Sequence, residues 1–282
     1  MVLFVCGTPS QKTAGNVKCF IMLANYHTHT PRCNHAQGSE REYIERAIEH
    51  GFSVLGFSDH TPQPYPKDYV STIRMGMDEI ENYTGTLVTL REEYKDRIKI
   101  LIGYEVEYPH KYFDKLISEL KKFPLDYIIQ GQHFAPDEVG GAYMGYASDD
   151  EDRLKAYVDL TIEGMKTGLF SYLAHPDLIN FTGDDETYKK HMIRIVEASL
   201  ECGLPLEVNM LGFTDKRNYP CNRFFKMASE MGAQFVIGCD AHVPEAVVQP
   251  ESVPGFTAFL ERNGISTGDN IIELRDVAKL TE

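Results

Sequence analysis

From residue 23 onward the sequence runs through seven β-α units, in which a short apolar segment alternates with a segment of helical periodicity. Apolar and β-branched residues predict strands over 23–28, 54–58, 98–106, 127–129, 171–174, 206–208 and 235–239. The longer periodic segments predict helices over 39–50, 78–95, 110–122, 186–202 and 223–231, with one more before Gly168. Such an alternation is typical of a parallel sheet covered by helices, either open or closed into a barrel.

Local signals mark where these helices begin and end. Ser39 and Glu42 have the spacing of a capping box, and Ser148 and Glu151 repeat it, so a helix is expected to start after each serine. A glycine follows the end of four predicted helices and precedes the next strand, which is typical C-cap use: Gly51, Gly168, Gly203 and Gly232.

The length of 282 residues allows one domain or two, because an α/β barrel commonly fills about this length alone. We find no linker and no low-complexity segment between the repeated units. The sequence therefore predicts a single α/β domain over residues 23–282. Residues 1–22 have no clear periodicity, and we expect them to form an N-terminal extension outside the fold.

Composition excludes several functional classes. The 28 Lys and Arg stand against 42 Asp and Glu, so the net charge of −14 argues against a nucleic-acid partner, and no basic run offsets it. No apolar run approaches the ~20 residues of a membrane helix, and no secretory leader is recognised. The six cysteines are scattered without a Cys-x-x-Cys pair, which favours reduced thiols and a cytoplasmic protein.

Side chains that commonly bind metals recur at or just beyond the carboxyl ends of the predicted strands. In a β/α barrel these ends converge on one face, where active sites are built. The nine candidate ligands are His27, His29, His35, His60, Glu105, His133, His175, Asp240 and His242. They predict a single metal site at that face of the barrel.

Spacing supports this interpretation. His27 and His29 are two residues apart, so on an extended strand both imidazoles point the same way and can bind one metal. Glu107 lies two residues beyond Glu105 on the same strand face and is its rival as a bridging carboxylate. Asp59, beside His60, is a candidate to orient a ligand imidazole or, alternatively, to cap a loop.

Other histidines and cysteines do not fit the pattern. His50, His110 and His191 lie in or at the ends of predicted helices, and we assign them no chemistry. Cys33 and Cys239 are close to candidate ligands, but we expect them to be small buried residues and not thiolate ligands.

The motifs that carry these residues resemble those of the polymerase and histidinol phosphatase (PHP) superfamily, and more closely its histidinol-phosphatase branch. The resemblance covers about 25–248, with Gly103-Tyr104-Glu105 supporting Glu105 over Glu107 as the bridging ligand. It also rests on 57–60, 207–209 and 217–220. It implies a distorted (β/α)7 TIM-like barrel, with the active site at the C-terminal ends of the strands, holding three divalent metal ions.

The resemblance also implies how the metals are shared among the ligands. One ion would take His27, His29, Glu105 and Asp240, a second would take His35, His60 and His242, and a third His133 and His175 while sharing Glu105. Glu105, Asp240 and His242 are the expected catalytic residues. A mixed set of His and carboxylate ligands suits zinc, manganese or iron, and residue types do not choose among these metals.

Clustered divalent cations lower the pKa of bound water and neutralise phosphoryl oxygens, so the predicted reaction is phosphomonoester hydrolysis by a metal-bound hydroxide. Phosphate recognition is expected to use arginine, whose planar guanidinium matches phosphate geometry. Arg217 is the first candidate because it lies in the loop after the sixth strand and matches an arginine of the family pattern. Arg74 and Arg153 are the other two candidates, and a surface position is the alternative for each.

The sequence thus predicts a metal-dependent phosphomonoester hydrolase acting on a small molecule, with L-histidinol phosphate of histidine biosynthesis as the substrate that the resemblance favours. One alternative is a phosphatase of the same fold acting on a sugar phosphate, a nucleotide or phosphotyrosine. Another is a nuclease or phosphodiesterase of the same superfamily, which the net charge disfavours. A metal-binding protein without turnover is the remaining possibility.

Overall fold

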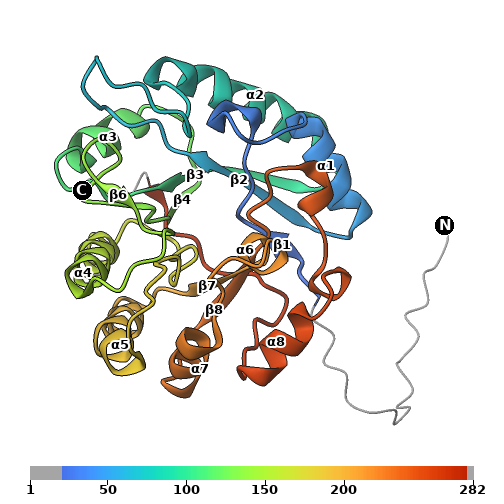
Figure 1. Cartoon of the computed structure of the whole chain (residues 1–282). Coiled ribbons are helices and arrows are strands. Elements are labelled where there is room, and N and C mark those ends of the chain that lie inside the picture. Colours follow the sequence, from blue (N-terminus) through green and yellow to red (C-terminus); the bar gives the residue numbers. More distant parts are fainter. Residues whose placement is uncertain (1–20, 278–282) are drawn as a thin grey trace, which may run out of the picture.

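The computed structural model describes residues 21–277, in which short parallel strands are surrounded by helices (Figure 1). Four strands form a parallel sheet in the order β1-β2-β3-β4, and β7 pairs with β8, also in parallel. The strands are β1 (Ala24–Asn25), β2 (Val54–His60), β3 (Lys99–Val106), β4 (Tyr127–Gln130), β7 (Leu206–Asn209) and β8 (Phe235–Gly238).

Isolated parallel bridges connect these two sheets into a ring. Leu173 bridges to Gln130 on β4 and to Leu206 on β7, and Thr28 bridges to Ala241 beyond β8. The segment 171–174 is therefore not a full strand, contrary to the prediction, although it fills the position of one. The chain turns away at His175, whose φ is +28°, and the next residue is a proline that has no N–H to donate to a ladder.

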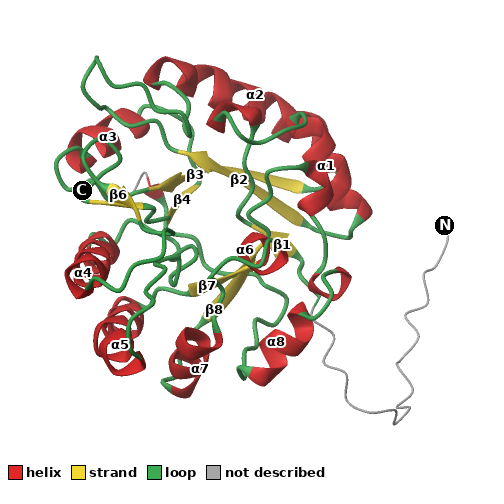
Figure 2. Ribbon diagram, viewed as in Figure 1, coloured by secondary structure: helices red, strands yellow, loops and turns green. Residues whose placement is uncertain are grey.

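The longer helices lie outside the ring of strands (Figure 2). They are α1 (Glu40–Glu49), α2 (Ile80–Tyr94), α3 (Phe113–Leu120), α4 (Glu151–Lys166), α5 (Asp185–Cys202), α7 (Asn222–Glu230) and α8 (Phe256–Arg262). The predicted α/β architecture is confirmed as a curled parallel sheet with helices around it, a distorted barrel with seven positions in its ring.

The two faces of β3 explain where the core and the site lie. Ile100, Ile102 and Tyr104 are buried against the surrounding helices. Leu101, on the opposite face, packs in a separate buried cluster with Tyr127 and Val236 of the other strands. Because side chains alternate along a strand, Glu105 shares the face of Leu101 and lies within the ring at the carboxyl end of β3.

One of the two predicted capping boxes is present. At α1 the Ser39 N–H donates to Glu42 Oε2 at 2.6 Å, and the box has the expected form. At α4 the prediction is wrong, because Asp150 is the N-cap and its carboxylate accepts the N–H groups of Asp152 and Arg153. Asp is as good an N-cap as Ser, and it stands directly before the first helical residue.

Several short elements between the strands and helices were not predicted. A hairpin of β5 (Phe134–Ala135) and β6 (Ala142–Tyr143) follows β4, and the short helix α6 (Met210–Thr214) follows β7. Four 3-10 helices are also present in the described chain: η1 (Pro31–Cys33), η2 (Met77–Glu79), η3 (Pro244–Ala246) and η4 (Pro250–Ser252). Most of these elements lie in the loops that follow strands.

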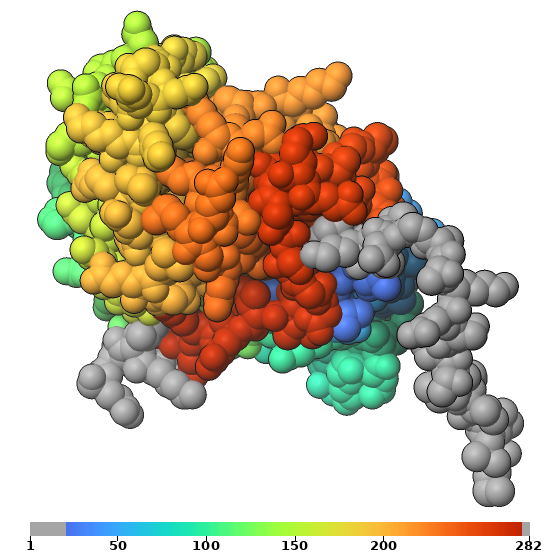
Figure 3. Space-filling model, turned by 90° about the horizontal axis from the view of Figure 1, so that it is seen from below, coloured from blue at the N-terminus to red at the C-terminus, as the bar shows by residue number. Residues whose placement is uncertain are grey.

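The N-terminal boundary of the fold differs from the prediction. Met22 is 1% exposed, its N–H donates to Gln249 Oε1 at 2.8 Å and its carbonyl accepts from Gln249 Nε2 at 3.0 Å. Met22 therefore belongs to the core, while residues 1–20 of the expected extension lie outside the described residues. The red C-terminal segment lies beside this blue start of the fold (Figure 3), where the Leu23 N–H donates to the Asp269 carbonyl.

Among residues 21–277, no helix is both long enough and apolar enough to cross a membrane. The cysteines in this range are unpaired, as predicted: Cys33, Cys202, Cys221 and Cys239. Cys6 and Cys19 lie outside the described residues.

Candidate metal centre

Glu105 is the centre of the histidine cluster. Its side chain is 1% exposed, and among the described residues no contact of Oε2 has the geometry of a hydrogen bond. Oε1 lies 2.7 Å from His175 Nε2, and Oε2 lies 2.8 Å from His60 Nδ1. Three further ring nitrogens lie at 3.6 Å, those of His27, His29 and His133.

Asp240 provides a second carboxylate on the other side of the first two histidines. Its Oδ1 lies 3.1 Å from His29 Nε2 and 3.4 Å from His27 Nε2. Asp240 follows β8 and has a φ of +49°, a left-handed conformation that turns the chain after the strand. His27 Nε2 and His29 Nε2 therefore face a space bounded by Glu105 on one side and Asp240 on the other.

A second group lies nearer the opening of the site. The rings of His35 and His242 stack with centroids 4.6 Å apart, and those of His35 and His60 with centroids 5.3 Å apart. His35 Nδ1 lies 2.7 Å from the Cys33 carbonyl and His242 Nδ1 lies 3.0 Å from the Asp240 carbonyl. These contacts involve Nδ1 of both rings and leave Nε2 for another ligand.

The donor atoms fit divalent cations. In the described chain several buried atoms at the centre have polar neighbours but no contact with hydrogen-bond geometry: His27 Nε2, His29 Nε2, Glu105 Oε2 and His242 Nε2. Leaving such groups unpaired is costly, and a bound cation would satisfy them. Ligand atoms of His27, His29 and Asp240 lie within 4.8 Å of one another, as do those of three further sets: His35, His60 and His242; His27, Glu105 and His175; His29, His60 and Glu105.

Two predicted non-ligands also come near the centre. Cys33 forms a group of the same size with His29 and His242. Glu107 lies with Oε1 3.2 Å from His133 Nδ1, on the opposite side of that ring from Glu105, and it also binds Arg74. Glu107 is thus placed to orient His133, whereas Glu105 lies among the ring nitrogens.

Further carboxylates hold the ligand rings in place. Glu207 is fully buried, and its Oε1 lies 2.7 Å from His27 Nδ1, while Oε2 accepts the His175 N–H at 2.9 Å. Sequence reasoning did not assign it a role, although an acidic residue within the apolar strand 206–208 was a usable signal. Asp59 makes contacts that suit both of its predicted roles. Its Oδ1 lies 3.4 Å from His29 Nδ1, as an orienting residue would, and its carboxylate accepts the N–H groups of His60 at 2.8 Å and Thr30 at 3.2 Å, as a loop cap would.

Without metal charges, the protonation states of these residues depend on one another. Burial acts to raise the pKa of Glu105, but the charges of His133, His60 and His27 outweigh it and hold that pKa well below its usual range. Burial acts to lower the pKa of His27, but the carboxylates of Glu207, Asp240 and Glu105 raise it to about 10. A metal bound at His27 must therefore displace a proton.

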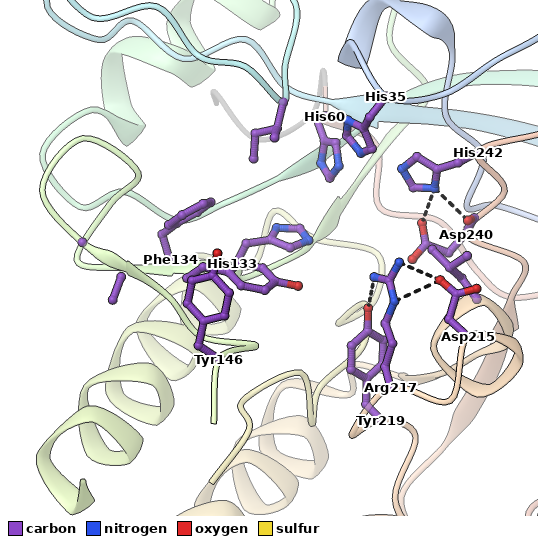
Figure 4. Close-up of a pocket in the computed structure, with 15 residues that line it drawn as sticks. His35, His60, His133, Phe134, Tyr146, Asp215, Arg217, Tyr219, Asp240 and His242 are labelled. Carbon is purple, nitrogen blue, oxygen red and sulfur yellow. Dashed lines mark hydrogen bonds and ion pairs between the residues drawn. The ribbon is translucent and has the colours of Figure 1, made fainter. Parts of the chain in front are cut away.

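A cavity of about 720 Å³ opens directly above the cluster (Figure 4). Five candidate ligands line it: His35, His60, His133, Asp240 and His242. Aromatic side chains provide much of the remaining wall, namely Phe134, Tyr143, Tyr146 and Tyr219. The hairpin β5–β6 supplies Phe134 and Tyr143, so this element shapes the space over the metal ligands.

Only one of the three candidate arginines lines this cavity. Arg217 points into it, with Nη1 2.9 Å from the Tyr219 hydroxyl and Nη2 2.9 Å from Asp215 Oδ2 (Figure 4). Arg74 is 2% exposed and lines a different cavity, because Glu107 and Glu138 each bind it at 2.5 Å. Arg153 instead donates to the Tyr143 carbonyl and is absent from the lining of this cavity.

The histidines predicted to have no metal role lie elsewhere. His110 is exposed and lies 3.5 Å from Glu163, and His191 lies 2.8 Å from Glu151 on neighbouring helices. His50 is the C-cap of α1. All nine predicted ligands, in contrast, lie around Glu105 and the cavity.

Fold and site together define a parallel α/β barrel with a histidine-rich candidate metal centre at the carboxyl ends of its strands. The model of the PHP domain family matches residues 25–210, which contain most of these ligands. The chain belongs to the PHP domain family.

Relatives and solved structures are consistent with this membership. A Deinococcus radiodurans protein named "Probable histidinol-phosphatase" is 29% identical over 270 residues, covering 92% of this chain and 95% of that protein. A Schizosaccharomyces pombe protein with the same name is 28% identical and covers 80% of this chain and 82% of its own length. The structure of histidinol phosphate phosphatase from Lactococcus lactis, complexed with zinc, L-histidinol and phosphate, has a TM-score of 0.68 at 18% identity. The match covers 92% of this chain and 98% of that one.

Proposed function

We propose that this protein is a metal-dependent phosphomonoester hydrolase that converts L-histidinol phosphate and water to L-histidinol and phosphate. The observation that carries this proposal is the convergence of seven histidines and two carboxylates beneath a cavity lined by Arg217 and aromatic rings. The names of the Deinococcus radiodurans and Schizosaccharomyces pombe relatives support the choice of substrate. We place this activity in the cytoplasm, where the unpaired cysteines would stay reduced.

The donor set suits up to three divalent cations, with zinc, manganese and iron as candidates. His27, His29, Glu105 and Asp240 would hold one ion, and His35, His60 and His242 a second. His133 and His175 would hold a third together with Glu105. Bound cations of this kind supply a water of lowered pKa and neutralise charge on phosphoryl oxygens.

The residues of the chain would position the substrate and tune the ligands. Arg217 would bind a phosphoryl oxygen through charge-assisted hydrogen bonds, because its guanidinium faces the cavity beside Asp240. Glu207 and Asp59 would keep the rings of His27 and His29 in the orientation that presents Nε2 to the centre. Glu105, Asp240 and His242 would surround the reacting phosphoryl group.

The aromatic wall favours an ester with a planar ring in its leaving group. Tyr143 packs against Phe134 and Tyr146, with ring centroids 5.7 and 5.3 Å apart. Such edge-on and tilted surfaces stack well with an imidazole, which an aliphatic sugar phosphate lacks. Nucleotides and phosphotyrosine also carry rings, so they are the competing substrates that a direct comparison has to include.

The test is phosphate release by the purified protein from L-histidinol phosphate, a sugar phosphate, a nucleoside monophosphate, phosphotyrosine and a short oligonucleotide, with metal analysis of the same sample. We expect the highest kcat/KM for histidinol phosphate and a stoichiometric content of divalent metal. A higher kcat/KM for another monoester would overturn the assignment of histidinol phosphate as the substrate. Cleavage of the oligonucleotide alone would overturn the assignment as a phosphomonoester hydrolase. Metal binding without any turnover would favour a non-catalytic role.

A further inference from the structure

One acidic residue of the cavity is separate from the metal centre. Asp215 and Asp240 are the acidic residues of the lining, and Asp240 is already placed between His27 and His29. Asp215 follows α6 and its side chain is 45% exposed. The cavity thus contains one carboxylate that is open to solvent and free of contact with a candidate metal ligand in residues 21–277.

Asp215 is paired with the cation that we assign to phosphate binding. Its Oδ2 accepts from Arg217 Nε at 3.2 Å and from Arg217 Nη2 at 2.9 Å. Both bonds end on the same oxygen, and the third guanidinium nitrogen of Arg217, Nη1, donates to the Tyr219 hydroxyl. Asp215 Oδ1 takes no part in these bonds with Arg217. A substrate whose anion bound Arg217 would therefore meet a negatively charged acceptor beside that guanidinium (Figure 4).

We propose that Asp215 selects phosphoesters that carry a protonated amine on the carbon next to the ester carbon. This inference rests on the proposed function of the cavity, in which the phosphoryl group lies between the metal ligands and Arg217. An ammonium so close to the phosphate would then reach Asp215, one side chain away from the Arg217 guanidinium. Arg217 would then bind the phosphate of the substrate, and Asp215 would bind the ammonium of the same molecule.

The charge of a metal-loaded site would favour such a carboxylate. Divalent cations at the centre would make the floor of the cavity strongly positive, and Arg217 adds a further positive charge above it. A cationic amine would be repelled by such a site unless a negative group compensated for it. Asp215 is the group in the lining that is placed to do so, whereas an amine-free ester would gain nothing from it.

The experiment compares two pairs of esters that differ only in the amine. The first pair is L-histidinol phosphate and its des-amino analogue, 3-(imidazol-4-yl)propyl phosphate. The second is 2-aminoethyl phosphate and ethyl phosphate. For each pair the ratio of kcat/KM with and without the amine is measured for the wild type, for Asp215→Asn and for Asp185→Asn. Asp185 carries the matched control substitution because it is ion-paired with Arg223, 89% exposed, and outside the lining of the cavity.

We expect the wild type and Asp185→Asn to prefer the amine-bearing ester of each pair. In Asp215→Asn the ratio should fall by about tenfold or more, the size of a lost charge-assisted hydrogen bond. Using a ratio removes any effect of the freed Arg217 on the phosphate, since both esters share it. A ratio that stays at the wild-type value, or an equal loss for both members of a pair, would overturn the role of Asp215.

The second pair separates this inference from the proposed function. If the wild type hydrolyses neither imidazole ester but prefers 2-aminoethyl phosphate in an Asp215-dependent manner, histidinol phosphate is the wrong substrate and the role of Asp215 stands. If the wild type hydrolyses histidinol phosphate and its des-amino analogue equally well, the function stands and the role of Asp215 is rejected.

Discussion

The Glu105 carboxylate is surrounded by five imidazoles, the nearest at 2.7 Å, with 1% of its side chain exposed. So many basic nitrogens around one acid are not needed for packing, since a buried polar cluster is costly unless every member is satisfied. The arrangement is explained if cations share this carboxylate. Glu105 is therefore the residue at which the metal assignment can be tested most directly.

We expect Glu105→Gln to keep the fold and to lose bound metal together with at least about 100-fold of kcat, because an amide cannot supply the negative charge that balances the cations. Metal content and phosphate release are measured on the same preparation, with circular dichroism for the fold. Glu92→Gln is the matched control, because Glu92 is 73% exposed and paired only with Lys95 among the ion pairs of the described chain. Normal kcat in Glu105→Gln would refute the shared-carboxylate assignment.

Substitutions of Arg217 test whether this residue binds the phosphate of the substrate. Arg217→Ala should raise KM for histidinol phosphate by about 10- to 100-fold, which corresponds to one lost charge-assisted bond, and should leave metal content unchanged. Arg217→Lys should recover only part of the loss, because lysine cannot present two parallel donors. Steady-state kinetics of the three proteins decide the matter, and an unchanged KM in Arg217→Ala would place the arginine outside the phosphate site.

At the scale of residues, the convergence of the candidate ligands could be predicted, because strand ends converge whatever the loop conformations are. The orienting residues could be predicted only in part. Asp59 was accessible through its neighbour His60, whereas Glu207 is linked to His27 by a contact across 180 positions that no local pattern contains. Which candidate arginine reaches the cavity could not be predicted for the same reason. Arg74 is held elsewhere by Glu138, which is 64 positions away in the sequence.

At the scale of elements, glycine at strand ends makes room for the buried carboxylates. A Cβ on Gly131, just after β4, would lie 1.9 Å from Glu105 Oε1, and one on Gly238 at the end of β8 would lie 1.8 Å from Glu207 Oε1. Neighbouring parallel strands therefore leave space for each carboxylate within the ring of the barrel. The same register places Glu105 opposite Ile129, two residues before Gly131.

Gly131→Ala should displace Glu105 and so reduce metal content and kcat, with overpacking that costs about 1–3 kcal/mol of unfolding free energy. Gly140→Ala is the control because a Cβ there meets nothing within 4 Å and the residue lies in the neighbouring loop. Denaturant unfolding gives the stability and metal analysis gives the content. Wild-type metal content in Gly131→Ala would show that the carboxylate position is not fixed by this glycine.

Long periodic elements were predicted well, and short ones were not. The helix α5 covers Asp185–Cys202 against an expected 186–202, because apolar periodicity over many residues is a strong signal. The segment 171–174 has the composition of a strand but forms only single bridges, since the turn at His175 ends it early. The hairpin β5–β6 has two residues per strand, too few for an alternating pattern to identify.

At the scale of the whole molecule, distant segments close the barrel around the site. The His29 N–H donates to the Ala241 carbonyl at 2.9 Å, and Asn25 Oδ1 accepts the Cys239 N–H at 2.9 Å. The first and last strands of the ring are thus joined next to His27 and Asp240, which come from opposite ends of the chain. The net charge of −14 does not describe this site, where bound cations would make the potential locally positive.

Because the ligands come from strands all around the ring, metal binding should stabilise the whole barrel and not one loop. A site saturated about 100-fold above its Kd adds about 2.7 kcal/mol, so chelation should lower the melting temperature by about 5 °C or more, and added zinc or manganese should restore it. Differential scanning calorimetry of treated and reloaded protein measures the shift. In Glu105→Gln the shift should shrink, because its native state binds metal less tightly. A melting temperature that chelation leaves unchanged, in protein shown to have lost its metal, would mean that the folded barrel does not depend on the cations.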